Sequence, residues 1–256
     1  MAAAQIRREL FTLSSVSFWD GRGTDNSMKR EVLSGSSAML VAATGLVLGV
    51  ATFADGADGT TKAVRHVTGR TIFSEESPKA ELSVRKGYRF IGTQQVNLYG
   101  VAEAEQYVFA KQGRDNTVES FYWIQFEHFL PSNDRTYNYG SKKTTQIGDL
   151  HFVYNVGSWP DYLAEMAGNP ASDGAGIERL LEKQHLSFPH RAAHVRMFHS
   201  PSADHRSELM IIYGEALLQN SAVPVREKGV DLDTESPASA QVLLEHARQG
   251  LVIQTR

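Results

Sequence analysis

The chain has 256 residues, 41% hydrophobic and 21% charged, which is the composition of a folded protein and excludes a disordered chain. A formal net charge of -3 argues against a broad nucleic-acid surface, which needs lysine and arginine in excess, so we expect no nucleic-acid partner. The absence of cysteine excludes disulfides, thiolate nucleophiles and cysteine-ligated metal centres. It leaves the compartment open, because a protein exported without disulfides has the same composition.

An apolar run follows a basic pair near the start of the chain. Lys29 and Arg30 come first, and residues 32–54 then carry no charge. Basic, apolar and small-residue regions in this order are typical of a signal peptide, while residues 36–54 also approach the roughly 20 residues that span a bilayer. We therefore predict that residues 28–54 are a signal peptide or transmembrane anchor. Because the positive charges precede the run, the later residues are expected outside the cytoplasm, in the periplasm or the extracellular space.

This segment has alternative interpretations. Residues 36–54 can form a buried helix of a soluble domain, although Gly45 and Gly49 favour a membrane segment because glycine weakens helices in water. If the run is not cleaved, residues 36–54 bind the protein to the membrane. If residues 28–54 direct export, we interpret residues 1–27 as an upstream segment that arises from a misassigned gene start.

The next part of the chain is polar and then becomes strand-like. Residues 55–80 are rich in Gly, Thr, Ser, Asp and Glu, and we predict a linker or an irregular lead-in to a globular domain of residues 81–256. Within that domain, residues 90–99 and 103–110 alternate like strands on either side of Gly100, which predicts a hairpin.

A third strand is predicted at residues 117–131, where the sequence reads TVESFYWIQFEHFLP. One face would carry Val118, Tyr122, Ile124 and Phe126, and the other would carry Phe121, Trp123 and Phe129. Apolar side chains on both faces are typical of a strand that is covered on both sides. We therefore expect this strand to lie in the middle of the sheet.

Helices and further strands follow in the second half of the domain. In the sequence GSWPD, Ser158 can cap a helix whose first turn holds Pro160 and Asp161. The predicted elements are strands at 149–156, 192–199 and 208–213 and helices at 159–166, 176–184 and 240–247. This order predicts an α+β fold: a mostly antiparallel β-sheet with two central helices and a C-terminal helix, preceded by the signal peptide or membrane anchor.

The aromatic strand offers a candidate ligand-binding face. Trp123, Gln125 and Glu127 share one side of it, so two polar groups lie beside an aromatic wall, and pockets are typically apolar with a few placed polar groups. We predict that these three residues contact a small-molecule ligand. The alternative is that they belong to the core. His128 points to the opposite face and cannot form one acid–base pair with Glu127.

Histidines gather later in the chain, where five of the nine lie between His185 and His205. Imidazole is a common ligand of zinc, copper and nickel, so His190 and His194, which share one face of a strand, are candidate metal ligands. The spacing is weak support, because His199 points to the other face and no His-Glu-x-x-His pattern is present. The alternative is a set of exposed or singly hydrogen-bonded histidines.

No motif identifies a reaction. The sequence has neither the Gly-x-Ser-x-Gly of a nucleophile elbow nor a phosphate-binding loop, so enzymatic activity, catalytic residues and cofactors stay open. We expect an exported protein that binds a small apolar or amphiphilic ligand. Two alternatives are an exported metal-assisted hydrolase, suggested by the histidines, and a membrane-anchored interaction module of an envelope assembly, suggested by an uncleaved apolar run.

Overall fold

The computed structural model describes residues 64–139, 143–159, 170–188, 190–217, 221–226 and 229–256, which form two antiparallel sheets and three α-helices. The larger sheet has the order β11 (Val230–Asp231), β8 (Leu150–Trp159), β9 (Ala192–His199), β10 (Ser207–Ala216), β6 (Val118–Phe129), β5 (Ala102–Gln112) and β4 (Arg89–Leu98), with β7 (Thr144–Ile147) also paired to β8. The smaller sheet has the order β1 (Arg65–Thr68), β2 (Thr71–Ser74), β3 (Ala80–Val84) and β12 (Leu251–Thr255). The helices are α2 (Asp173–Lys183), α3 (Leu232–Glu235) and α4 (Pro237–Gln249), and a 3₁₀ turn, η1, covers Arg114–Asn116.

The α+β class and the mostly antiparallel sheet are confirmed. The strand predicted at 192–199 coincides with β9, and the hairpin around Gly100 is that of β4 and β5. The predicted signal peptide or anchor at 28–54 lies outside the described residues. None of the helices within the described ranges is long and apolar enough for a membrane span.

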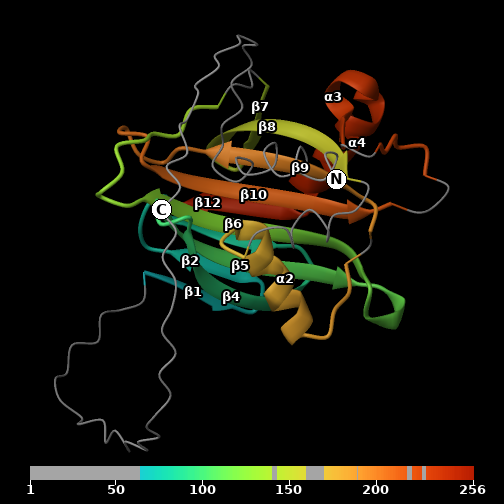
Figure 1. Ribbon diagram of the computed structural model, residues 1–256, viewed down its shortest axis with the longest axis horizontal. Helices are drawn as coiled ribbons and strands as arrows, with labels where there is room; N and C mark the ends of the chain where they lie inside the picture. The colour runs from blue at the N-terminus through green and yellow to red at the C-terminus, as the bar shows by residue number, and fades with distance from the viewer. Residues whose placement is uncertain (1–63, 140–142, 160–169, 189, 218–220, 227–228) are drawn as a thin grey trace, which may run out of the picture. The chain divides into compact units, whose positions relative to one another are not determined.

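Two of the three hydrophobic clusters in the described residues lie on opposite faces of the larger sheet, and the third includes Phe129 and Tyr137. On one face, α2 packs Ile177 and Leu180 against Val108 and Trp123, and Figure 1 shows this helix lying across β4 and β5. On the other face, the residues of the smaller sheet and of α4 form one cluster with the larger sheet. The hydroxyl of Tyr122 donates to the carbonyl of Ala247 at 2.8 Å and so joins β6 to α4.

The aromatic strand β6 lies between β5 and β10, in the interior of the larger sheet as predicted. Its alternation is broken once, because Gln112 pairs with Val118 while Lys111 pairs with Ser120. The intervening residue is a β-bulge, and a bulge reverses which face the preceding side chain occupies. Val118 therefore lies in the α2 core with Phe121 and not, as predicted, with Tyr122.

The expected linker at 55–80 differs most from the structure. It contains β1 and β2, which form a tight hairpin whose turn begins at Gly69 with a φ of 60°. Glycine adopts this left-handed conformation without steric cost, so the short hairpin forms despite weak apolar alternation. The C-terminal helix is confirmed as α4, but a strand that was not predicted, β12, follows it because its five residues find a partner in β3.

Only the first residue of the helix predicted at 159–166 lies in the described part of the chain, and it is not helical. Trp159 is the last residue of β8 and not the first of a helix, because the strand is paired with β9 up to that residue. The remainder of the predicted helix at 159–166 lies outside the described residues. The second central helix is confirmed as α2, which begins three residues earlier than predicted because Ser172 accepts a hydrogen bond from the Ala175 amide at 3.1 Å.

Candidate ligand-binding site

The three predicted ligand-binding residues form a hydrogen-bonded row on the α2 face of β6. The Trp123 indole donates to Oε1 of Gln125 at 3.1 Å, and Nε2 of Gln125 donates to Oε2 of Glu127 at 2.7 Å. All three side chains are buried, and Glu127 is 4% exposed. The shared face follows from strand alternation, whereas contact with a ligand stays a prediction.

Glutamine amides continue this row across the neighbouring strands. Gln94 donates to Gln106 at 2.7 Å, and Gln106 donates both to Gln125 at 2.8 Å and to the carbonyl of Asp173 at 3.0 Å. A Cβ atom at Gly176 would lie within 2.4 Å of the ends of the Gln94 and Gln106 side chains, so a larger residue would have to displace these two amides. The first turn of α2 is therefore held beside Glu127.

Glu127 is positioned as a hydrogen-bond acceptor. Besides the bond from Gln125, its Oε1 accepts from the Tyr137 hydroxyl at 2.6 Å. Burial raises the pKa of Glu127 to about 7, and the bonds from Tyr137 and Gln125 oppose the rise, while the charge of Asp173 adds to it. Burial also raises the pKa of Asp173 to about 6, opposed chiefly by the charge of Arg196.

A second carboxyl faces Glu127 directly. Glu208 on β10 is the register partner of Glu127, so the two side chains leave the same face of adjacent strands. Glu208 is 2% exposed, and burial, followed by the charge of Glu127, raises its pKa well above the usual range. Within the described part of the chain, neither Oε2 of Glu208 nor the neighbouring Tyr139 hydroxyl makes a hydrogen bond of acceptable geometry.

A cavity of about 570 Å³ is lined by Tyr137 and Tyr139, the two tyrosines whose hydroxyls act on this carboxyl pair. The side chains around it include Tyr137, Tyr139, Val153, Phe198, Ser200 and His205. The rings of Tyr139 and Phe198 stack with centroids 5.3 Å apart. Because the two tyrosines line the cavity and their hydroxyls act on the two glutamates, the tyrosines connect the cavity lining to the carboxyl pair.

An imidazole lies on the same face of the sheet, farther along β9. The ring of His194 stacks on Trp159 with centroids 3.7 Å apart, and the guanidinium of Arg196 lies 4.8 Å from the Trp159 ring. Burial, with a smaller contribution from Arg196, lowers the pKa of His194 well below the usual range, so this imidazole is neutral. Its Nδ1 has no hydrogen-bond partner among the residues that the structure describes.

The predicted metal ligands differ in their surroundings. His194 is buried in this stack, whereas His190 is exposed. His199 points to the opposite face, where its Nδ1 lies 2.9 Å from the carbonyl oxygen of His151. Across the described ranges, no group of three or more His, Asp or Glu side chains is arranged to hold a metal ion. Metal binding by His190 and His194 therefore stays a prediction.

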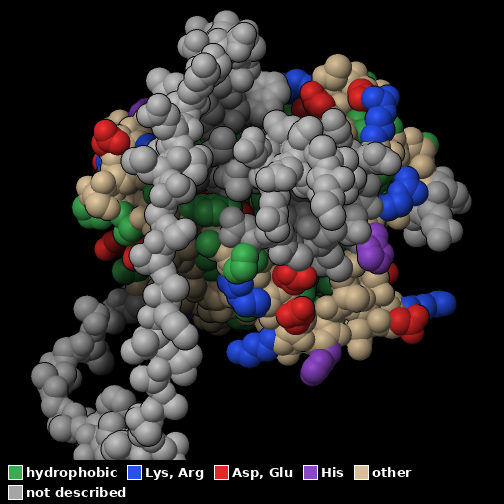
Figure 2. All heavy atoms as spheres, viewed as in Figure 1, with side chains coloured by type: hydrophobic (Ala, Val, Ile, Leu, Met, Phe, Trp, Pro, Cys, Tyr) green, Lys and Arg blue, Asp and Glu red, His purple; other side chains and the backbone are tan. Residues whose placement is uncertain are grey.

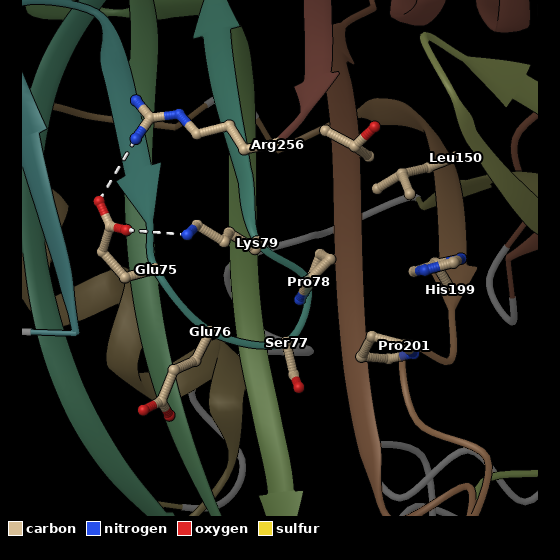
Figure 3. Close-up of a pocket in the computed structure, with 10 residues that line it drawn as sticks. Glu75, Glu76, Ser77, Pro78, Lys79, Leu150, His199, Pro201 and Arg256 are labelled. Atoms are coloured by element: carbon tan, nitrogen blue, oxygen red, sulfur yellow. Dashed lines mark hydrogen bonds and ion pairs between the residues drawn. The ribbon is translucent and has the colours of Figure 1, made fainter.

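A second cavity, of about 510 Å³, lies where the loop after β2 approaches Leu150 and His199 (Figure 3). Three of its charged side chains are paired with one another. Glu75 lies 3.3 Å from Arg256 and 3.8 Å from Lys79, as the dashed lines in Figure 3 mark. In the first cavity, by contrast, the lining residue Tyr139 has a buried hydroxyl without a hydrogen bond among the described residues.

Several residues of the site were not found from the sequence. Glu208, Asp173, Tyr137 and Tyr139 come from three separate segments, and only the pairing of β10 with β6 and the position of α2 bring them to Glu127. One sequence signal was available: Glu208 is a charged residue at the start of an apolar run, and such a residue must be paired, protonated or functional when it is buried.

Comparison with protein-family models gave no match, and neither the curated proteins nor the solved structures that were compared include a match.

Proposed function

We propose that this domain binds a small amphiphilic ligand in the 570 Å³ cavity, with the polar end of the ligand at Glu208 and its apolar part against Tyr139 and Phe198. One observation carries the proposal. Oε2 of Glu208 and the neighbouring Tyr139 hydroxyl are buried polar atoms that lack a hydrogen bond of acceptable geometry among the described residues, and Tyr139 lines an aromatic-walled cavity.

The free-energy cost of a buried polar atom without a hydrogen bond supports this proposal. A buried polar atom without a hydrogen-bond partner costs about 1–3 kcal/mol, so native proteins rarely keep one without a reason. A ligand that hydrogen-bonds to Glu208 removes this cost, and it also buries apolar surface against the aromatic rings. Trp123, Gln125 and Glu127 then act mainly by holding the carboxyl pair and the first turn of α2 in place.

The test is binding of the neutral probe N-phenyl-1-naphthylamine, whose fluorescence rises in an apolar site. We expect saturable binding to the full-length protein and displacement by n-decanol. Val153→Trp fills the cavity and should weaken probe binding at least about ten-fold, since a filled cavity has no room for the ligand. Val252→Trp, at a residue of β12 that is 44% exposed, is the matched control and should bind as the wild type does. Absence of saturable binding, or equal binding by both variants, contradicts the proposal.

We also propose that the domain is exported, either as a soluble protein or as a membrane-anchored one. The support is the order of Lys29, Arg30 and the uncharged run 32–54 in the sequence. In the coloured parts of Figure 2, acidic and basic side chains lie near one another. The metal-assisted hydrolase and the envelope interaction module rest on the histidines and the apolar run alone, and the binding function is preferred.

A further inference from the structure

The carboxyl pair beside the cavity indicates what charge the ligand carries. We propose that the ligand is an organic cation with N–H donors, a protonated amine, whose ammonium group binds Glu127 and Glu208 and displaces the proton that the pair holds in the free protein. This inference rests on the proposed binding function and adds the chemical class of the ligand to it.

The charges around the pair require a cation. Glu127 and Glu208 face each other, and Asp173 acts on both as a third carboxyl. Arg196 is the cation that acts on Asp173, and no ion pair in the described ranges includes either glutamate. Burying two like charges without a counterion is costly, so the free protein keeps a proton on the pair.

The hydrogen bonds show which glutamate holds that proton. Both oxygens of Glu127 accept bonds, from Tyr137 and Gln125, which is the arrangement of an ionised carboxylate. Glu208 has an oxygen without a bond in the described part of the chain, and its environment favours the neutral acid. An ammonium group would supply both the missing donor and the missing positive charge, and such charge-assisted bonds are about twice as strong as neutral ones.

The cavity wall favours a cation as well. The faces of aromatic rings attract ammonium groups by about 0.5–2 kcal/mol, and the cavity is lined by Phe198 and by Tyr139, whose hydroxyl neighbours Glu208. The Tyr139 hydroxyl, which faces Glu208 without a hydrogen bond of acceptable geometry, can accept one further N–H. The remaining hydrocarbon of the amine would then pack on these rings.

The same groups determine how binding depends on pH. Glu208 is faced by Glu127 from β6, by Asp173 from α2 and by the hydroxyls of Tyr137 and Tyr139, with Arg196 acting through Asp173. The pKa values of both tyrosines are raised above their usual range, so they stay neutral, and Glu127 and Asp173 are the groups that titrate near neutrality. Because ammonium binding favours the ionised carboxyl pair, affinity for an amine should rise with pH through the pKa of Glu127 at about 7, whereas affinity for an alcohol should not.

The experiment is isothermal titration calorimetry of the full-length protein with n-decylamine, n-decyltrimethylammonium and n-decanol at about pH 8, where Glu127 is ionised, in two buffers of different ionisation enthalpy. We expect decylamine to bind at least about ten-fold more tightly than decanol and to release about one proton. The trimethylammonium compound should be intermediate, because it has the charge without the N–H donors. Glu208→Gln should lose the preference for the amine and the proton release while it still binds decanol.

Glu103→Gln is the matched control, because Glu103 is 57% exposed and pairs with His128 outside this site. It should behave as the wild type does. Equal affinity for amine and alcohol, or amine preference that survives in Glu208→Gln, overturns the cation proposal and leaves the binding function standing. If none of the three compounds binds, the binding function itself is wrong.

Discussion

Glu208 is the residue whose placement departs most from ordinary core packing. Its carboxyl is buried at the start of an otherwise apolar strand and lies opposite another buried carboxyl. The pKa of Glu127 is raised to about 7, that of Asp173 to about 6, and that of Glu208 well above its usual range. Each of these shifts makes the folded protein bind more protons than the unfolded chain does, since an unfolded carboxyl titrates near its ordinary pKa.

The direction of these pKa shifts predicts how the free energy of unfolding depends on pH. The contribution of these carboxyls to stability is fully present below about pH 4, where folded and unfolded chains are both protonated, and it is lost as the pH rises through the raised folded values. The free energy of unfolding should therefore fall between about pH 5 and pH 8. Glu208→Gln keeps the shape and removes the charge, so it should make the fall shallower and raise stability at about pH 8 by about 1–3 kcal/mol.

Urea unfolding of the full-length protein at several pH values measures this effect. Glu103→Gln, an exposed glutamate of β5, is the control and should leave the profile unchanged. Parallel profiles for Glu208→Gln and the wild type would show that Glu208 titrates normally in the folded protein.

At the scale of elements, α2 is the part that closes one side of the site. Its apolar stripe, Ile177, Leu180 and Leu181, packs on the sheet, and its first turn meets the glutamine row at Gln106. The helix starts where Ser172 accepts the Ala175 amide, and the acidic Asp173 in the first turn suits the positive end of the helix dipole. The cap therefore determines where Asp173 lies relative to the carboxyl pair.

Ser172→Ala removes this capping bond and should lower the free energy of unfolding by about 1 kcal/mol, as for other N-caps. Ser236 at the start of α4 is the matched control, because its side chain makes no capping bond to the helix and donates to Ser239 instead. Ser236→Ala should cost less than half as much. Chemical denaturation of both variants provides the comparison, and equal losses would mean that the Ser172 hydroxyl does not cap α2.

At the scale of the whole molecule, the described residues are assembled by contacts between distant parts of the chain. The strand β12 pairs with β3. The central strand β6 pairs with β5, which comes just before it in the sequence, and with β10, which comes much later. Because α2 packs on one face of the larger sheet and α4 packs on the other, side chains on both faces of β6 are buried.

Export is a property of the whole molecule, and its prediction concerns the mature chain. Expression of the full-length gene in its native host, cell fractionation and N-terminal sequencing of the recovered protein provide the measurement. A chain that starts just after Ala54 in an extracytoplasmic fraction is the result expected for a cleaved signal peptide, since small residues precede that position. Retention in the membrane fraction with residues 36–54 present would identify an anchor. A soluble cytosolic protein that still begins at Met1 would contradict export.

The sequence by itself determined the local features of this protein. Alternation predicted β4, β5, β6 and β9 close to their observed limits, and a continuous apolar run predicted most of β10. Alternation also placed Trp123, Gln125 and Glu127 on one face, because it depends only on the pleat of a single strand. It did not predict β1, β2 or β12, whose few residues carry little pattern and form strands only because a distant partner is present.

The residues of the site are brought together only by the tertiary structure. Glu127 and Glu208 are 81 positions apart in the numbering, and the register that makes them neighbours is set by how β10 packs on β6, which no local pattern encodes. The bulge that moves Val118 to the α2 face, and the segment that brings Tyr137 and Tyr139 to the carboxyl pair, are likewise results of pairing and packing. A local sequence pattern describes which side of a strand a residue occupies, whereas the neighbours of that residue depend on the whole fold.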